Sequence, residues 1–233
     1  MSTRDVGTKW DRWLDVALVG WPVGFSLMAL AGIVYGVAIA GDGNSVLGGM
    51  AGIMGVLLVG LPVLGVALGV VLAVSLYMDA SSLGETGIEW VPSPVLYAIG
   101  GLLIPLVGYN YLWRRYKYLP RKTHESVWWY ATVILGGISA VLSLVGLVDG
   151  VGIGMAVGFP AAIVLSGPVA ATIYMDARFL HEKAAREQSG KLNPANYLLG
   201  MWFATLIGTA LLPIQVLVLG YYAYKRQQIA GLR

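Results

Sequence analysis

Two aspartates and one glutamine are the residues in this sequence whose types and positions are best suited to chemistry. Asp79 and Asp176 each end a long apolar run, inside the tetrapeptide Tyr-Met-Asp-Ala that occurs at 77–80 and again at 174–177. A carboxylate at a membrane boundary is costly, and the dipole at the C-terminal end of a helix opposes it. The simpler interpretation is a solvated carboxylate that starts a loop. Otherwise, either the helix continues beyond the membrane or the carboxylate has a cationic or hydroxyl partner. Gln215 lies inside the last apolar run, where its amide needs hydrogen-bonding partners. Together the three side chains could line a polar path for an ion or small solute.

Other kinds of reactive site are missing from the sequence. The chain has no cysteine, which excludes disulfides, thiolate metal sites and thiol catalysis. Its two histidines, His124 and His181, lie in polar connections, so they do not form an intramembrane pair that could ligate a haem. No metalloprotease, P-loop or nucleophile-elbow motif occurs. We therefore expect no catalytic residues, no metal site and no cofactor, and a lipid-modifying enzyme is the least supported class.

Long uncharged runs must position these residues. Hydrophobic residues make up 58% of the chain and charged residues 12%, and the mean hydropathy is +0.74. A helix of ~20 apolar residues crosses the hydrocarbon core of a bilayer. Six runs are long enough, which predicts an all-helical polytopic transmembrane bundle in the cell membrane. The expected spans are 16–40, 46–78, 95–113, 127–148, 151–175 and 195–222.

Matched landmarks divide these runs into two related triplets. Each tetrapeptide is followed by a polar loop, then by Ser-Pro at 93–94 or Asn-Pro at 193–194, and then by a Tyr-rich basic exit at 108–115 or 220–226. This order predicts a duplication. The expected units are a polar segment 1–12, a first three-helix repeat 13–119, a basic link 120–125, a second repeat 126–226 and a tail 227–233.

The number of crossings in each repeat determines whether the two copies have the same or opposite orientation in the membrane. Three crossings are an odd number, so two successive copies would be inverted in the membrane, as in many secondary transporters. The Lys and Arg distribution then favours an outside N-terminus by a small margin. An alternative remains, because the second run is about 33 residues long, or ~50 Å as a helix, which exceeds a simple crossing. A break at Gly60-Leu61-Pro62 would give seven spans, with the N-terminus inside and the C-terminus outside.

Basic residues interleave with tyrosine and tryptophan after the third run. This pattern fits an aromatic belt beside anionic headgroups rather than a nucleic-acid surface. The predicted lipid-headgroup contacts are Arg114, Arg115, Lys117, Arg121 and Lys122. Glycine pairs spaced by four, such as 20 and 24, or 32 and 36, let helices approach closely inside the bundle or between protomers.

Three sequence features between residues 77 and 117 also carry a resemblance to a known group of proteins. The chain here resembles small uncharacterised membrane proteins of halophilic archaea. The resemblance is carried by the Tyr-Met-Asp-Ala end of a span, by the segment Trp-Val-Pro-Ser-Pro-Val-Leu-Tyr-Ala-Ile-Gly-Gly at 90–101 and by the Arg-Arg exit. The likeness covers mainly 77–117 and, more loosely, 174–226. It implies a plasma-membrane location and no assigned activity.

Two hypotheses about function follow from the sequence. The first is a channel or transporter for an ion or small solute, with a path at the interface of the two copies. The second is a non-catalytic membrane scaffold or accessory subunit that binds lipid or a partner through its glycine faces and basic strip. The expected partners are the lipid bilayer and either a second copy in a homodimer or a membrane subunit, with no nucleic acid.

Overall fold

The computed structural model describes residues 10–40, 45–84, 90–118, 127–148, 159–187, 193–208 and 213–230, and all the regular structure in these ranges is helical. The predicted all-helical fold is confirmed. Within these ranges, three helices contain stretches long and apolar enough to cross a membrane: Trp10–Ile39, Ala51–Gly84 and Ile163–His181. The helices are α1 (Trp10–Ala40), α2 (Ser45–Gly84), α3 (Pro94–Leu103), α4 (Pro105–Tyr118), α5 (Val127–Val148), α6 (Phe159–Glu187), α7 (Pro194–Gly208) and α8 (Pro213–Ala230).

The second apolar run forms one helix. α2 has 40 residues and passes Pro62 without a break. A proline removes one backbone hydrogen bond but, when neighbouring helices support the chain, does not have to end a membrane helix. The seven-span alternative, which needs two crossings within this run, is therefore wrong.

The third apolar run does not form one helix, contrary to the prediction. Ile104 is extended, with φ −139° and ψ 103°, and separates α3 from α4. Pro105 has no N–H to donate to the carbonyl of Gly101, so the α3 helix stops there. α4 then folds back along α3, which brings the rings of Tyr97 and Tyr111 to 4.9 Å. The run is a helical hairpin whose two ends lie on the same side.

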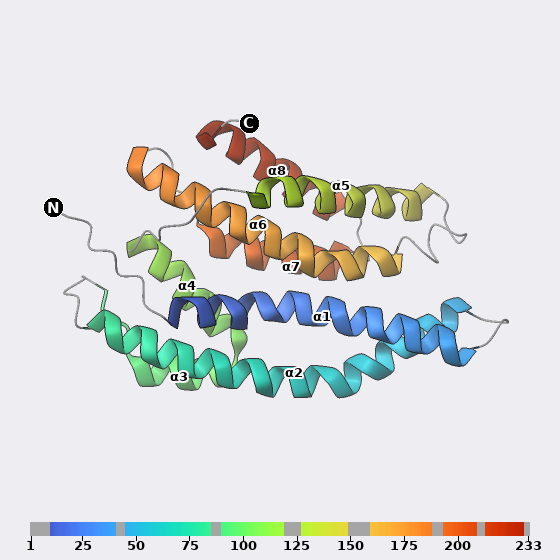
Figure 1. Ribbon diagram of the computed structural model, residues 1–233, viewed down its shortest axis with the longest axis horizontal. Coiled ribbons are helices and arrows are strands. Elements are labelled where there is room, and N and C mark those ends of the chain that lie inside the picture. Colours follow the sequence, from blue (N-terminus) through green and yellow to red (C-terminus); the bar gives the residue numbers. More distant parts are fainter. Residues whose placement is uncertain are drawn as a thin grey trace.

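The sixth run is divided in the same way. α7 ends at Gly208 and α8 begins at Pro213, with 209–212 outside the described residues. Tyr197, in the first turn of α7, contacts Tyr222, which lies well beyond the start of α8, at 4.9 Å between ring centroids. This contact requires α7 and α8 to run antiparallel, as they do in Figure 1. The expected third crossing of each triplet is thus replaced by a hairpin.

The two halves of the chain, α1–α4 and α5–α8, run in the same direction and are not inverted. Figure 1 shows α1 and α5 pointing one way, with α2 and α6 returning the other way. Asp15, near the start of α1, accepts a hydrogen bond from Tyr174 in the middle of α6, at 2.6 Å. The inverted arrangement assumed that the third and sixth runs each cross. Because each is a hairpin, each half makes an even number of long passes and the next half begins on the original side.

Close helix contacts pack the four long helices in the order α2, α1, α6, α5. A Cβ at Gly32 of α1 would overlap the backbone of Ile53 in α2, and one at Gly52 would overlap Gly36. These contacts confirm the predicted close approach inside the bundle for α1 and α2. α1 meets α6 at Gly167, where a Cβ would overlap the carbonyl group of Pro22.

Candidate functional site

Asp79 is completely buried and is held by two side chains of α4. The Tyr111 hydroxyl donates a hydrogen bond to Asp79 Oδ2 at 2.7 Å, and Arg115 Nε donates to the same oxygen at 2.8 Å. Tyr111 and Arg115 are four positions apart, so one face of α4 presents both. Arg115 also forms an ion pair with Asp11 in the first turn of α1. We name Asp79, Tyr111 and Arg115 the first clamp.

Asp176 is held in the same way by two side chains of α8. The Tyr222 hydroxyl donates to Asp176 Oδ2 at 2.6 Å, and Arg226 Nε donates to it at 3.0 Å. Asp176 is completely buried, and the Arg226 guanidinium lies 4.2 Å from the ring centroid of Trp129 in α5. We name Asp176, Tyr222 and Arg226 the second clamp. Its tyrosine and arginine have the same spacing as those of the first.

Each clamp fixes one hairpin to the long helix that precedes it. A carboxylate in a dry site is stable only when charge and hydrogen bonds compensate it, and both clamps supply a guanidinium and a hydroxyl. The interpretation of Asp79 and Asp176 as solvated carboxylates is therefore wrong, and the alternative of a cationic or hydroxyl partner is right. We call the end of the bundle that contains both clamps the clamp end.

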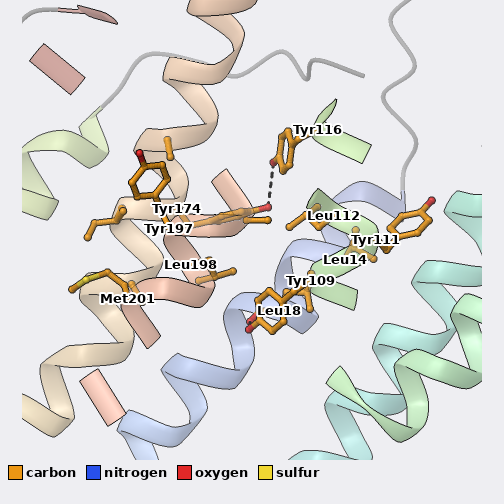
Figure 2. Close-up of a cluster of buried hydrophobic side chains, with 14 of the residues drawn as sticks. Leu14, Leu18, Tyr109, Tyr111, Leu112, Tyr116, Tyr174, Tyr197, Leu198 and Met201 are labelled. Atoms are coloured by element: carbon orange, nitrogen blue, oxygen red, sulfur yellow. Dashed lines mark hydrogen bonds between the residues drawn. The ribbon is translucent and has the colours of Figure 1, made fainter. Parts of the chain in front are cut away.

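A third polar cluster, the latch, joins the two halves at the clamp end. Asp15 of α1 accepts a hydrogen bond from Tyr174 and forms an ion pair with Arg178 at 2.6 Å. Figure 2 shows the hydroxyl of Tyr174 pointing from α6 toward that of Tyr116 in α4, and the two oxygens are 3.2 Å apart. The ring of His181 packs edge-on against Tyr116 at 5.2 Å. The latch therefore holds α6 of the second half against α1 and α4 of the first.

A smaller contact joins the halves on the same side. Asn193 caps α7 by accepting a hydrogen bond from the Ala195 N–H at 3.1 Å. Its amide nitrogen donates to the carbonyl of Trp113 in α4 at 2.8 Å. The Asn-Pro landmark, which the sequence indicated only as a helix start, thus also connects the two hairpins.

The other predicted residues are placed less closely together. Gln215 lies in the first turn of α8, at the opposite end of that helix from the second clamp, and its side chain is outside the described part of the structure. Of the predicted headgroup contacts, Arg114 and Lys117 are exposed, whereas Arg115 is only 2% exposed and belongs to the first clamp. The assignment of Arg115 to lipid is wrong, because two aspartates hold it inside. Arg121 and Lys122 lie outside the described residues.

The sequence contains a local pattern that predicts the clamps. Both basic exits have the spacing Tyr-x-x-x-Arg, at 111–115 and at 222–226. An i, i+4 pair of this kind on one helix face, facing an aspartate in each half, predicts a repeated three-residue contact. The latch residues Asp15 and Tyr174 had no comparable signal, since they pair across the halves.

The arrangement is suited to holding helices together. The buried carboxylates of both clamps and the latch are engaged by arginine and tyrosine, and no group of three metal-ligating side chains occurs within the described ranges. Comparison with protein-family models, with curated proteins and with solved structures finds no match. The resemblance to membrane proteins of halophilic archaea stays a prediction.

Proposed function

We propose that this protein is a non-catalytic membrane scaffold that crosses the bilayer four times, through α1, α2, α5 and α6, and embeds its two clamped hairpins in one leaflet. α5 has 22 residues, or ~33 Å of helix, which is enough for a crossing. α3 has 10 residues, or ~15 Å, which is half of the hydrocarbon thickness. The apolar part of α4, before Arg114, is similarly short. A hairpin with arms of this length reaches one leaflet deep and returns.

The distribution of basic residues carries the proposal. All 15 Lys and Arg fall within 4–12, 114–122, 178–191 and 225–233. The helices next to these segments meet at the clamp end, through Asp11 with Arg115, Asp15 with Arg178, and Asp176 with Arg226. The segments 41–44, between α1 and α2, and 149–158, between α5 and α6, contain aspartate and no base. By the positive-inside rule, the clamp end faces the cytoplasm, and α1 begins and α8 ends on that side.

The geometry favours a scaffold over the channel or transporter hypothesis. A transport path between the halves needs space at their interface, but α1 and α6 touch at Gly167 so closely that a Cβ does not fit. The Gly167 N–H donates to Ser26 Oγ at 2.9 Å across the same contact. Asp79 and Asp176 each face their own hairpin rather than a shared channel. The transport hypothesis stays open to direct measurement.

Exposed basic and aromatic side chains at the clamp end support contact with anionic lipid. Arg114 and Lys117 are exposed on α4, and the Lys117 ammonium lies 5.5 Å from the ring centroid of Tyr118. Lys225 is paired in the same way with the exposed ring of Tyr221, at 6.0 Å. Such pairs suit the headgroup region, where a ring and a cation can share one interface. A homodimer or a partner subunit stays a prediction.

Cysteine reporters at two ends of the bundle test the crossing pattern without background, because the chain has no cysteine. Gln227→Cys is an exposed site at the end of α8, and Ile39→Cys is a 66% exposed site at the far end of α1. In intact cells, a membrane-impermeant maleimide should label Ile39→Cys, and it should label Gln227→Cys only after permeabilisation. Labelling of both from one side would overturn the four-crossing proposal.

Ion and solute flux in proteoliposomes separates the scaffold from the transporter. The scaffold predicts the same flux as in empty liposomes. A flux that disappears in the double variant Asp79→Asn, Asp176→Asn would support transport, provided that the variant keeps its helical circular dichroism. The double variant Tyr111→Phe, Tyr222→Phe is the matched control, since it loosens both clamps and keeps both carboxylates.

A further inference from the structure

The two leaflets contain very different amounts of this protein if the four-crossing arrangement proposed above holds. Both hairpins lie on the clamp side, because α4 and α8 end there beside Asp79 and Asp176. In that half of the bundle, both arms of both hairpins accompany α1, α2, α5 and α6. Figure 1 shows α1 and α2 continuing together well beyond the turn between α3 and α4. The far half contains the long helices alone.

The depth of the hairpins follows from contacts along α2. At the clamp, Asp79 contacts Arg115, and near the hairpin turn a Cβ at Gly69 would lie 3.4 Å from the carbonyl oxygen of Leu102. Ten residues of helix between positions 69 and 79 correspond to about 15 Å, the thickness of one leaflet of hydrocarbon. In α8, the nine residues from Tyr222 back to Pro213 correspond to about 14 Å. The first hairpin therefore turns, and α8 begins, near the bilayer midplane.

The residues at the first turn fit a lipid environment. Leu102, Leu103 and Ile104 are 50%, 72% and 52% exposed, and all three are apolar. The long helices continue past this level, since α1 runs 25 residues from Asp15 to Ala40, or about 37 Å. The hairpins thus add four helical segments to one leaflet and none to the other.

We infer that the protein is a wedge that prefers membrane curved so that the leaflet on the clamp side is convex. A helix with its side chains is about 10–12 Å across, so four extra segments occupy about 320–450 Å² more area in that leaflet. A bilayer accommodates unequal areas with least strain where the fuller leaflet lies on the outside of the bend. The partner that this shape fits is therefore a lipid surface of defined curvature, with the clamp end on its convex side.

The sign of the curvature preference can be tested with the protein in both orientations. The protein is reconstituted into giant vesicles of phosphatidylcholine with phosphatidylglycerol, and a membrane-impermeant maleimide dye is applied from outside. Dye on Gln227→Cys marks molecules whose clamp end faces out, and dye on Ile39→Cys marks molecules whose clamp end faces in. In a thin tether pulled from the vesicle, the ratio of dye to a lipid marker should rise for the first population and fall for the second. Equal ratios, or the opposite order, would overturn the inference.

A substitution at the hairpin turn tests whether the hairpins are the cause. Leu103→Lys places a charge at the midplane, which pulls the turn toward the interface and reduces the area excess. Val91→Lys is the control, since Val91 is 66% exposed just before α3 begins. Tether enrichment should fall in Leu103→Lys and persist in Val91→Lys. If the two variants sort alike, the hairpins are not the wedge. The same two reporters separate this result from the crossing pattern, because labels that fail to distinguish the two ends would refute the proposed scaffold instead.

Discussion

Replacing either Asp176 by asparagine or Arg226 by glutamine should break the second clamp and lower the free energy of unfolding. The two side chains are 0% and 3% exposed and contact each other at 3.0 Å. Removing one member of a buried ion pair costs about 3–5 kcal/mol, because the other charge stays in a dry site. The double variant should cost much less than the sum, since neither charge then lacks its counterpart. The expected coupling free energy is about 3 kcal/mol, which is large even for residues in contact.

Unfolding by sodium dodecyl sulfate titration in mixed micelles measures these four free energies, with the fluorescence of the 8 tryptophans as the signal. Lys225 and Gln228 give a matched control on the same helix, since they form an exposed hydrogen bond at 3.5 Å. The coupling in this control should stay below about 0.5 kcal/mol. If Asp176→Asn and Arg226→Gln prove additive, the two residues do not act as one clamp, and the explanation of the hairpin fails with it.

Three further tests concern other parts of the structure. Tyr222→Phe should lower the free energy of unfolding by about 1–2 kcal/mol in the same titration, because it removes one donor to a buried carboxylate and leaves the ion pair; a larger loss than for Asp176→Asn would contradict this order. Gly167→Ala should destabilise by about 1–3 kcal/mol, since its methyl group overlaps α1, while Gly137→Ala, which meets nothing within 4 Å, should be neutral or stabilising. The double variant Arg114→Gln, Lys117→Gln should weaken the preference for phosphatidylglycerol by about 2 kcal/mol, read from quenching by brominated lipid, and an unchanged preference would remove these residues from the headgroup contact.

The sequence predicted the helical class and the apolar runs, and it singled out Asp79 and Asp176, but as solvated carboxylates or members of a polar path rather than as clamps. It did not predict the direction of the second half, because the prediction assumed that each long apolar run crosses the membrane once. The run 95–113 is uncharged and long enough for a span, yet Pro105 and the extended Ile104 turn the chain back. Hydropathy does not distinguish a chain that passes through lipid from one that enters and returns. In the proposed arrangement all basic segments lie at one end of the bundle, and this follows when the third and sixth runs both fold back.

The sequence predicted one residue of each clamp, the aspartate, but not its partners. The two aspartates are conspicuous because a carboxylate is costly in lipid, but their arginine partners, Arg115 and Arg226, lie 36 and 50 positions later in the chain. The latch was not predictable, since Asp15 and Tyr174 are 159 positions apart and belong to different halves. Contacts of that range depend on how α1 packs on α6, which no local pattern in either helix specifies.

In the proposed four-crossing arrangement, the placement of Asp15 sets the order in which the parts of the protein can assemble in the membrane. A ribosome synthesising this chain delivers all three residues of the first clamp by position 115, so the first half can enter the membrane and close its hairpin early. Asp15 meets Tyr174 and Arg178 only when α6 has been made. Until then its carboxylate favours the water interface over lipid. Insertion of α6 is therefore the step at which the second half packs against an already folded first half. In a chain arrested before that step, the Asp15 carboxylate would lack Tyr174 and Arg178 and would lie exposed at the water interface.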